Sequence, residues 1–299
     1  MRTIVVTLST LLLLSACAQA RRAGPRKSTL YDPSKKALSH FHRQLTRTAN
    51  GKSQTRILQF GASHTEADLF TGYLRQYFQH QFGDAGHGFI MPARPWRGYR
   101  HMDVRVDSSS GWITDKAYRK DSKRDGLYGL AGFSVRTDSA DEWGMIGTAE
   151  NSAFGKRVDR FEVFYLQQPG GGRFDIEVDG NHYATVKTHA RTTSLGVRVV
   201  RVQDGPHELK LRPKGDGEVR LLGTVMERRA PGVIVDSLGI RGSRASVMLK
   251  WDDALWTAAV KRRRPDLIAL AYGTNESGDA RQPIEKYEQR LKRVMQKVK

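Results

Sequence analysis

The sequence predicts an α/β domain that is interrupted by an inserted β-sandwich, and three observations lead to this prediction. Short apolar strands followed by helical periodicity occur near both ends of the chain, over residues 56–82 and 233–298. From about residue 103 to 227, apolar and polar residues instead alternate with the period of two that is typical of strands. Turn signals such as Asp179-Gly180 separate these strands, at a spacing typical of a β-sandwich. The 299 residues are sufficient for about two domains.

Residues 1–16 have the pattern of a secretory signal peptide. A basic residue at position 2 precedes an apolar run over residues 4–14, which is too short to span a bilayer because a span needs about 20 residues. The motif Leu14-Ser15-Ala16-Cys17 resembles the lipobox of bacterial lipoproteins. This resemblance implies cleavage before Cys17 and lipidation of its thiol. Cleavage of an ordinary signal near residues 18–20 is the alternative.

Residues 17–54 are strongly basic and predict a lipoprotein tether. Nine lysines and arginines after Cys17 are opposed only by Asp32, a composition typical of a solvated, mobile linker. His40 and His42 are a weak candidate for a metal pair, because no carboxylate or cysteine cluster accompanies them. The net charge of +19 indicates anionic surroundings, such as lipid or a cell-wall polymer. Because Cys17 is the only cysteine, an intramolecular disulfide is excluded.

The predicted domain boundaries follow the change of period. Residues 55–98 form the first part of the α/β domain, residues 99–231 the insert, and residues 232–299 the second part. In the first part we expect a strand over 56–60, a helix over 69–82 that buries an apolar face, and a surface loop over 86–98. Further strands are expected at 161–166, 173–178, 183–187, 197–202, 207–212, 219–225, 233–239 and 267–271, and helices around 251–260 and 284–298.

Three candidate site residues follow predicted parallel strands, where ligand sites of α/β sheets occur. Ser63 follows the first strand at the start of a helix, Gly242 follows the second, and Asn275 follows the third. A serine nucleophile with a backbone N–H and an asparagine amide close by has the composition of an oxyanion hole. Each motif also has a purely structural interpretation. Ser63-x-x-Glu66 fits a helix capping box, Gly242 a turn, and Gly273-Thr274-Asn275 a strand-end turn with a helix cap.

These motifs together resemble the SGNH (GDSL-like) hydrolase family. Gly61-Ala62-Ser63-His64 is similar to its first block, Gly242 to its second-block glycine, and Gly273-x-Asn275 to its third block. The resemblance covers about residues 55–92 and 232–299, and it implies a flavodoxin-like three-layer fold. It also implies that Ser63 is the nucleophile, and that the N–H groups of Ser63 and Gly242 and the Asn275 amide form the oxyanion hole. The tether and the insert are similar to those of bacterial envelope esterases, including peptidoglycan O-acetylesterases, whose insert resembles a carbohydrate-binding module.

Two departures from the family pattern stand out. Ala62 replaces the usual aspartate, which is not the nucleophile. The final Asp-x-x-His block, which supplies the general base, is missing, because no histidine follows His207. The hydrolase domain is therefore expected to be incomplete at its C-terminal end, as in a truncated product. His87 and His101 are the candidate replacements for the base, whereas the His64 side chain is expected to point away from Ser63.

The resemblance implies a serine ester hydrolase of the bacterial envelope that deacetylates a cell-wall or exported polysaccharide, such as peptidoglycan, through an acyl-Ser63 intermediate. It implies no metal or organic cofactor. The protein would be anchored by lipid on Cys17 and face the periplasm, with the outer membrane favoured over the inner. The alternative is a non-catalytic glycan-binding lipoprotein. Candidate sugar-stacking residues are Trp96, Trp112, Trp143, Tyr99 and Tyr118. Nucleic-acid binding is not expected, since the basic run 261–264 stands at a helix end, where cations favour the dipole.

Overall fold

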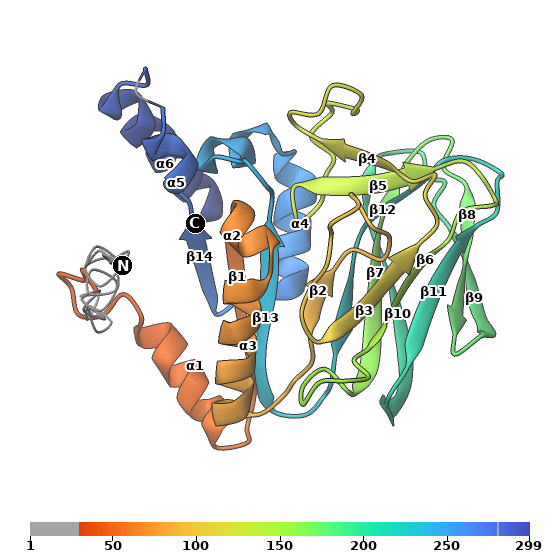
Figure 1. Ribbon diagram of the computed structural model, residues 1–299, viewed down its shortest axis with the longest axis horizontal. Coiled ribbons are helices and arrows are strands. Elements are labelled where there is room, and N and C mark those ends of the chain that lie inside the picture. The colour runs from red at the N-terminus through yellow and green to blue at the C-terminus, as the bar shows by residue number, and fades with distance from the viewer. Residues whose placement is uncertain (1–29, 280) are drawn as a thin grey trace, which may run out of the picture. The chain divides into compact units, whose positions relative to one another are not determined.

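The computed structural model describes residues 30–279 and 281–299 (Figure 1). The predicted signal peptide and Cys17 lie outside the described residues. The chain divides into two units, 1–38 and 39–299, and every element named below belongs to the second. The helices are α1 (Ser39–Ala49), α2 (Ser63–Glu66), α3 (Leu69–Phe82), the 3-10 helix η1 (Ala245–Lys250), α4 (Asp253–Arg263), α5 (Thr274–Ser277) and α6 (Ile284–Val298). The strands are β1 (Gln54–Gly61), β2 (Gly88–Ile90), β3 (Val104–Ser108), β4 (Ile113–Lys116), β5 (Phe133–Thr137), β6 (Gly144–Thr148), β7 (Val158–Gln167), β8 (Arg173–Val178), β9 (Asn181–Lys187), β10 (Ser194–Gly205), β11 (Glu208–Pro213), β12 (Val219–Glu227), β13 (Gly232–Gly239) and β14 (Leu267–Ala271).

Three parallel strands form one sheet in the order β13-β1-β14. Their registers align Gly61, at the end of β1, with Gly239 of β13 and with Ala271 of β14. All of β13 and most of β1 are buried, as is typical of parallel strands that are covered on both faces. The loops that follow the three strands therefore leave the sheet at the same edge.

Both faces of β1 are covered by other elements. Ile57 packs in a small cluster with Phe41 of α1, whereas Phe60 points to the main core and contacts the rings of Trp251 and Trp256. In Figure 1, α1 and α3 lie on one side of the parallel strands, and α4 lies on the side of the antiparallel sheets. Helix α1 falls within the stretch that the sequence predicts as a basic linker, so residues 39–49 correct that prediction. Its burial of Phe41 explains why this part of the basic stretch is ordered.

The prediction that α3 buries an apolar face holds only in part, because Phe78 and Phe82 pack against the cluster around Phe41 and the rest of the stripe does not. Leu69, Phe70, Tyr73 and Tyr77 are each more than half exposed, and the face turned toward β13 carries Thr71, Gly72, Arg75 and Gln79. Buried polar groups must find partners, and these do. The Arg75 guanidinium donates to both carboxylate oxygens of Asp68 at 3.0 and 3.1 Å and to the Val235 carbonyl at 3.1 Å. Asp68 also separates α2 from α3, because its φ of 53° lies in the left-handed region, and α3 keeps the predicted bounds of 69–82.

Two antiparallel sheets occupy the chain between α3 and β13. One has the order β10-β7-β12-β5-β4, with β2 paired to β12, and the other has the order β3-β6-β11-β8-β9. Their apolar residues share one core, in which Tyr165 of β7 contacts Phe174 of β8 across the two sheets. The expected surface loop over 86–98 is corrected here, since Gly88–Ile90 forms β2 and residues 88–93 are buried.

A buried ion cluster joins α4 to strands of the parallel sheet and of one antiparallel sheet. The Arg263 guanidinium donates to both oxygens of Asp236 on β13, at 2.7 and 2.9 Å, and to Glu227 on β12 at 2.6 Å. Glu227 also pairs with Arg56 of β1 and with Arg160 of β7. Burial alone would raise the pKa of Glu227, but the three guanidinium groups outweigh it and hold that pKa well below its usual range. Arg263 is the third residue of the basic run 261–264, so this run is partly structural.

No helix in residues 30–279 and 281–299 is both long enough and apolar enough to cross a membrane.

Candidate active site

Ser63 lies two residues beyond the end of β1, as the first residue of α2. The helix cap is Ala62, and no side chain caps the helix, so the capping-box interpretation of Ser63 is wrong. Glu66 instead accepts a hydrogen bond from the indole Nε1 of Trp96 at 2.7 Å and lies 3.4 Å from Arg241. Ser63 is half-buried, and within the described residues its hydroxyl makes no hydrogen bond. Its oxygen is therefore not committed to a structural role.

The short helix α2 rests directly on the ends of two strands. A Cβ atom at Gly239 would overlap the backbone nitrogen of Glu66, and one at Gly61 would overlap the side chain of Thr65. The hydroxyl of Ser237, on β13, donates to the Thr65 carbonyl at 2.8 Å and so holds α2 on the sheet. Glycine at positions 61 and 239 thus allows the close approach that positions Ser63 at the sheet edge.

Hydrogen bonds connect the three strand-end loops into one network. The Ile240 N–H donates to the Gly61 carbonyl at 3.0 Å, and the Ser243 N–H donates to the Ile240 carbonyl at 3.1 Å. The Asn275 amide in turn donates to the Ser243 carbonyl at 2.7 Å. The loops after β1, β13 and β14 are therefore held together, as expected from the parallel sheet.

Gly242 stands at the apex of this network. Its φ of +72° lies in the left-handed region, which confirms the turn interpretation, and no atom lies within 4 Å of a Cβ built there. Its N–H donates to no acceptor among residues 30–279 and 281–299. The cap interpretation of the Gly273 turn also holds, because Glu276 accepts the N–H of Gly273 at 3.1 Å and that of Ala245 at 2.7 Å. These structural roles of the two turns leave the Gly242 N–H free to donate a hydrogen bond to a ligand.

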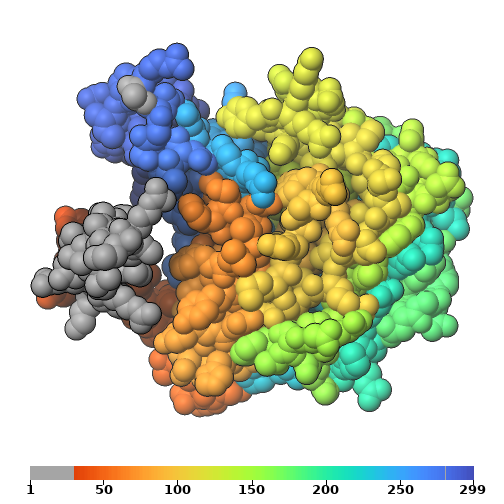
Figure 2. All heavy atoms as spheres, viewed as in Figure 1, coloured from red at the N-terminus to blue at the C-terminus, as the bar shows by residue number. Residues whose placement is uncertain are grey.

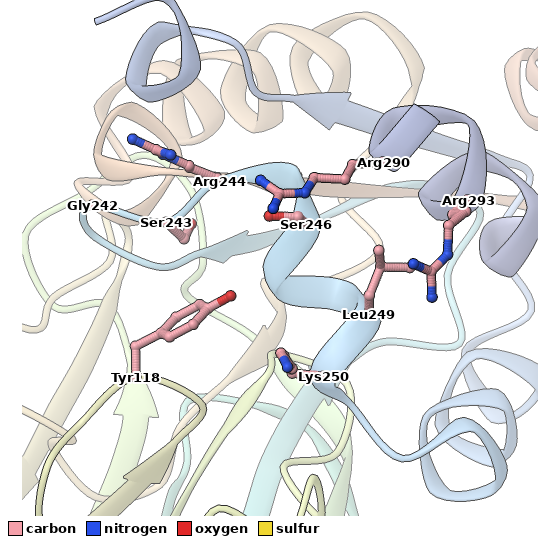
Figure 3. Close-up of a pocket in the computed structure, with 9 residues that line it drawn as sticks. All are labelled: Tyr118, Gly242, Ser243, Arg244, Ser246, Leu249, Lys250, Arg290 and Arg293. Atoms are coloured by element: carbon pink, nitrogen blue, oxygen red, sulfur yellow. The ribbon is translucent and has the colours of Figure 1, made fainter. Parts of the chain in front are cut away.

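Two cavities border the Gly242 turn. The larger, of about 580 Å³, is lined by Tyr118, Gly242, Ser243, Arg244, Ser246, Leu249, Lys250, Arg290 and Arg293 (Figure 3). The smaller, of about 220 Å³, shares Gly242 and Ser243 and includes Lys116. Burial and the nearby Arg119 charge lower the pKa of Lys116. In Figure 2 the light-blue 241–250 segment is exposed between the dark-blue C-terminal helix, the orange α2 region and the yellow 110–125 segment.

The cations of the larger cavity were not predicted from the sequence as site residues. Arg290 and Arg293 occur three positions apart, a spacing that places both on one side of a helix. That spacing was the available signal. Which side of α6 faces the loop after β13 depends on the packing of α6 on η1, and the sequence pattern does not reveal it.

Neither candidate replacement for the general base hydrogen-bonds to Ser63. His87 and His101 are buried and face each other, with His87 Nε2 3.2 Å from His101 Nδ1. Desolvation and the Arg75 charge lower the pKa of both rings, His87 most, so both are neutral near pH 7. His64 is exposed. No side chain in residues 30–279 and 281–299 hydrogen-bonds to the Ser63 hydroxyl.

The buried histidine pair predicts a loss of stability in mild acid. The unfolded chain binds protons at these two rings below pH 6.5, whereas the folded chain does not, so stability falls as the pH drops from about 6.5 toward the lowered pKa values. The slope is at most about 2.7 kcal/mol per pH unit for two protons. Urea unfolding across this range should show that His87→Gln reduces the slope and that the exposed control His64→Gln leaves it unchanged. An equal slope in all three proteins contradicts the prediction.

Most of the other sequence-predicted candidates have structural partners, and Tyr118 is the exception among those named here. His40 Nε2 lies 3.2 Å from Asp266, and no group of three metal-ligating side chains occurs in the part of the chain that the structure describes. Of the five aromatic candidates for sugar stacking, Tyr99 and Trp112 are buried, and Trp96 packs against Tyr99 and Phe133. Lys210 covers the ring of Trp143 at 4.3 Å. Tyr118 is 63% exposed and borders the larger cavity.

The fold and the joined strand-end loops support an SGNH-like esterase, and comparison with solved structures points the same way. A solved peptidoglycan O-acetylesterase matches with a TM-score of 0.67 and 26% sequence identity, over 87% of this chain and 67% of that chain. A family 6 carbohydrate-binding module matches 48% of this chain with a TM-score of only 0.28 and 12% identity, which is too weak to bear on function. No protein-family model and no curated protein match the sequence.

Proposed function

We propose that this protein is a serine ester hydrolase of the bacterial envelope that removes acetyl groups from a cell-wall or exported polysaccharide, with peptidoglycan as the leading candidate. The likeness to a peptidoglycan O-acetylesterase carries the proposal. The uncommitted hydroxyl of Ser63, beside loops that hydrogen bonds join to Gly242 and Asn275, supports it. The same likeness does not favour a purely glycan-binding role.

In the proposed reaction, the Ser63 oxygen attacks the acetyl carbonyl carbon and its proton passes to a base. The carbonyl oxygen becomes an oxyanion that accepts hydrogen bonds from the Ser63 and Gly242 N–H groups and from the Asn275 amide. Collapse of this intermediate breaks the ester bond, and the sugar hydroxyl leaves with a proton. Water then attacks acetyl-Ser63 and releases acetate, which restores the serine. No step in this scheme needs a metal or an organic cofactor.

The proposed organisation follows from the same assignment. The parallel strands and their helices would form a flavodoxin-like three-layer hydrolase domain over residues 55–98 and 232–299, except that β2 within the first range extends an antiparallel sheet of the insert. Residues 99–231 would form an inserted β-sandwich. The lipidated Cys17 would anchor the protein to the membrane, facing the periplasm. These assignments rest on the sequence resemblance, and the separate antiparallel sheets between α3 and β13 support the insert.

Trapping of the acyl intermediate tests the proposal. Wild-type protein incubated with 4-nitrophenyl acetate, or with O-acetylated peptidoglycan, should gain one acetyl group on the peptide that contains Ser63, detected by mass spectrometry after acid quenching. Ser63→Ala should not gain it. Ser194→Ala, which changes an exposed serine of β10 away from the Gly242 cavities, should gain it as the wild type does. Acetylation elsewhere with none on Ser63 overturns the proposed nucleophile.

A further inference from the structure

We propose that the 580 Å³ cavity beside Gly242 binds an anionic sugar unit of the substrate, and that Arg290 and Arg293 recognise its negatively charged oxygens. This inference deepens the proposed function, because it names the chemical class of the glycan at the same site.

The cavity has an uncompensated positive charge. Four of its nine lining residues are cationic, namely Arg244, Lys250, Arg290 and Arg293, and none is a carboxylate. Only Arg244 is paired, with Asp279 at 2.8 Å. Arg290 donates to the neutral side chain of Gln282, and within residues 30–279 and 281–299 neither Lys250 nor Arg293 forms an ion pair. By contrast, the buried Arg75, Arg220 and Arg263 each pair with a carboxylate.

The position of the cavity connects it to the proposed catalytic loops. Figure 3 shows Arg290 and Arg293 on the α6 side, Tyr118 on the opposite side, and the segment from Gly242 to Lys250 between them. The phenol of Tyr118 points into the space. Gly242 and Ser243 form one end of the cavity, and Asn275 donates to the Ser243 carbonyl. A glycan whose ester reached the Gly242 turn would therefore extend a neighbouring group toward the cations.

The chemistry of the walls favours an anionic sugar over a neutral one. Guanidinium groups bind carboxylate and phosphate oxygens through paired, charge-assisted hydrogen bonds. Like charges one helical turn apart repel each other, so Arg290 and Arg293 gain most when an anion lies between them. The ring of Tyr118 offers an apolar face to a sugar ring. A volume of about 580 Å³ also falls in the range of about 300–1,000 Å³ that is typical of small-ligand sites.

Direct binding measurements on Ser63→Ala test this inference without hydrolysis. The probes are N-acetylmuramic acid, which carries a carboxylate, its neutral counterpart N-acetylglucosamine, and N-acetylglucosamine 1-phosphate. Calorimetric titration should show that the carboxylate sugar binds at least about tenfold more tightly than the neutral one, and that added salt reduces the difference. Tighter binding of the phosphate sugar than of the carboxylate sugar would identify phosphate as the preferred oxyanion and support the same site.

A matched set of variants locates the effect. Arg290→Gln/Arg293→Gln should weaken binding of the anionic sugars by about tenfold or more and leave that of N-acetylglucosamine unchanged. Arg198→Gln, which removes an exposed charge from β10 outside the cavity, should have no effect. Unchanged thermal unfolding of each variant shows that the fold is intact. Equal binding of charged and neutral sugars, or equal losses in Arg198→Gln, overturns the inference. Failure of Ser63 acetylation would instead overturn only the proposed reaction.

Discussion

Replacing Arg263 with methionine is expected to lower the free energy of unfolding by about 3–5 kcal/mol. The substitution keeps most of the apolar stem but removes the guanidinium, and it leaves the carboxylate of Asp236 without its cation at about 1% exposure. Glu227 would keep Arg56 and Arg160 but lose its most buried partner. The loss is large because an unpaired buried charge retains its full desolvation penalty.

The control for this prediction is Lys261→Met on the same helix. Lys261 is exposed and makes no ion pair within the described residues, so its replacement should change the free energy of unfolding by less than about 0.5 kcal/mol. Urea titration of both variants, followed by circular dichroism, measures the difference. A value below about 1 kcal/mol for Arg263→Met would mean that the cluster contributes little net stability.

Ser63→Ala is expected to reduce turnover of an activated acetyl ester by at least about 10³-fold, down to the rate in buffer. The reason is that alanine cannot form the acyl intermediate, whereas the packing of α2 on Gly239 is unaffected by loss of one oxygen. The rate of 4-nitrophenolate release measures this effect. Identical rates for wild type and Ser63→Ala would contradict the esterase proposal.

A second substitution separates the nucleophile from the oxyanion hole. Asn275→Asp keeps the size of the side chain but replaces its N–H donors with an acceptor, and loss of one such donor costs about 10²–10³ in turnover. Because both residues act on the same intermediate, the double variant Ser63→Ala/Asn275→Asp should be no slower than Ser63→Ala alone. Thermal unfolding serves as the check, since Asn275 also donates to the Ser243 carbonyl.

The pattern of apolar residues in the sequence predicted the long or strongly apolar elements well. The bounds expected for β8 and β14, and the helix over residues 284–298, agree with the structure. Strands β3 to β6 had no individual prediction, because each has only four or five residues and loops rich in glycine and charge separate them. Helix α3 shows the opposite difficulty. Its apolar stripe was clear, but the buried side was decided by Arg75 and Asp68, and hydrophobic periodicity does not report such pairing.

The candidate site was predictable as far as it depends on strand ends. Ser63, Gly242 and Asn275 each follow a parallel strand, and the shared edge of the sheet follows from that order alone. The capping-box alternative could not be resolved from the sequence, because the competing partner of Glu66 is Trp96, 30 positions away. The cationic cavity also required the fold, since its walls combine Tyr118 with residues from η1 and α6.

The pairing of β1 with β13 has a consequence for the order in which the molecule can assemble. During synthesis the N-terminal part emerges first, and β1 (54–61) must wait for its partner at 232–239 while the intervening residues follow. At about 5–20 residues per second, this delay is on the order of ten seconds to half a minute. Throughout it, the apolar side chains of Leu58 and Phe60 have neither neighbouring strand. We therefore expect the newly emerged first 80 residues to be the part of this chain that holding chaperones bind.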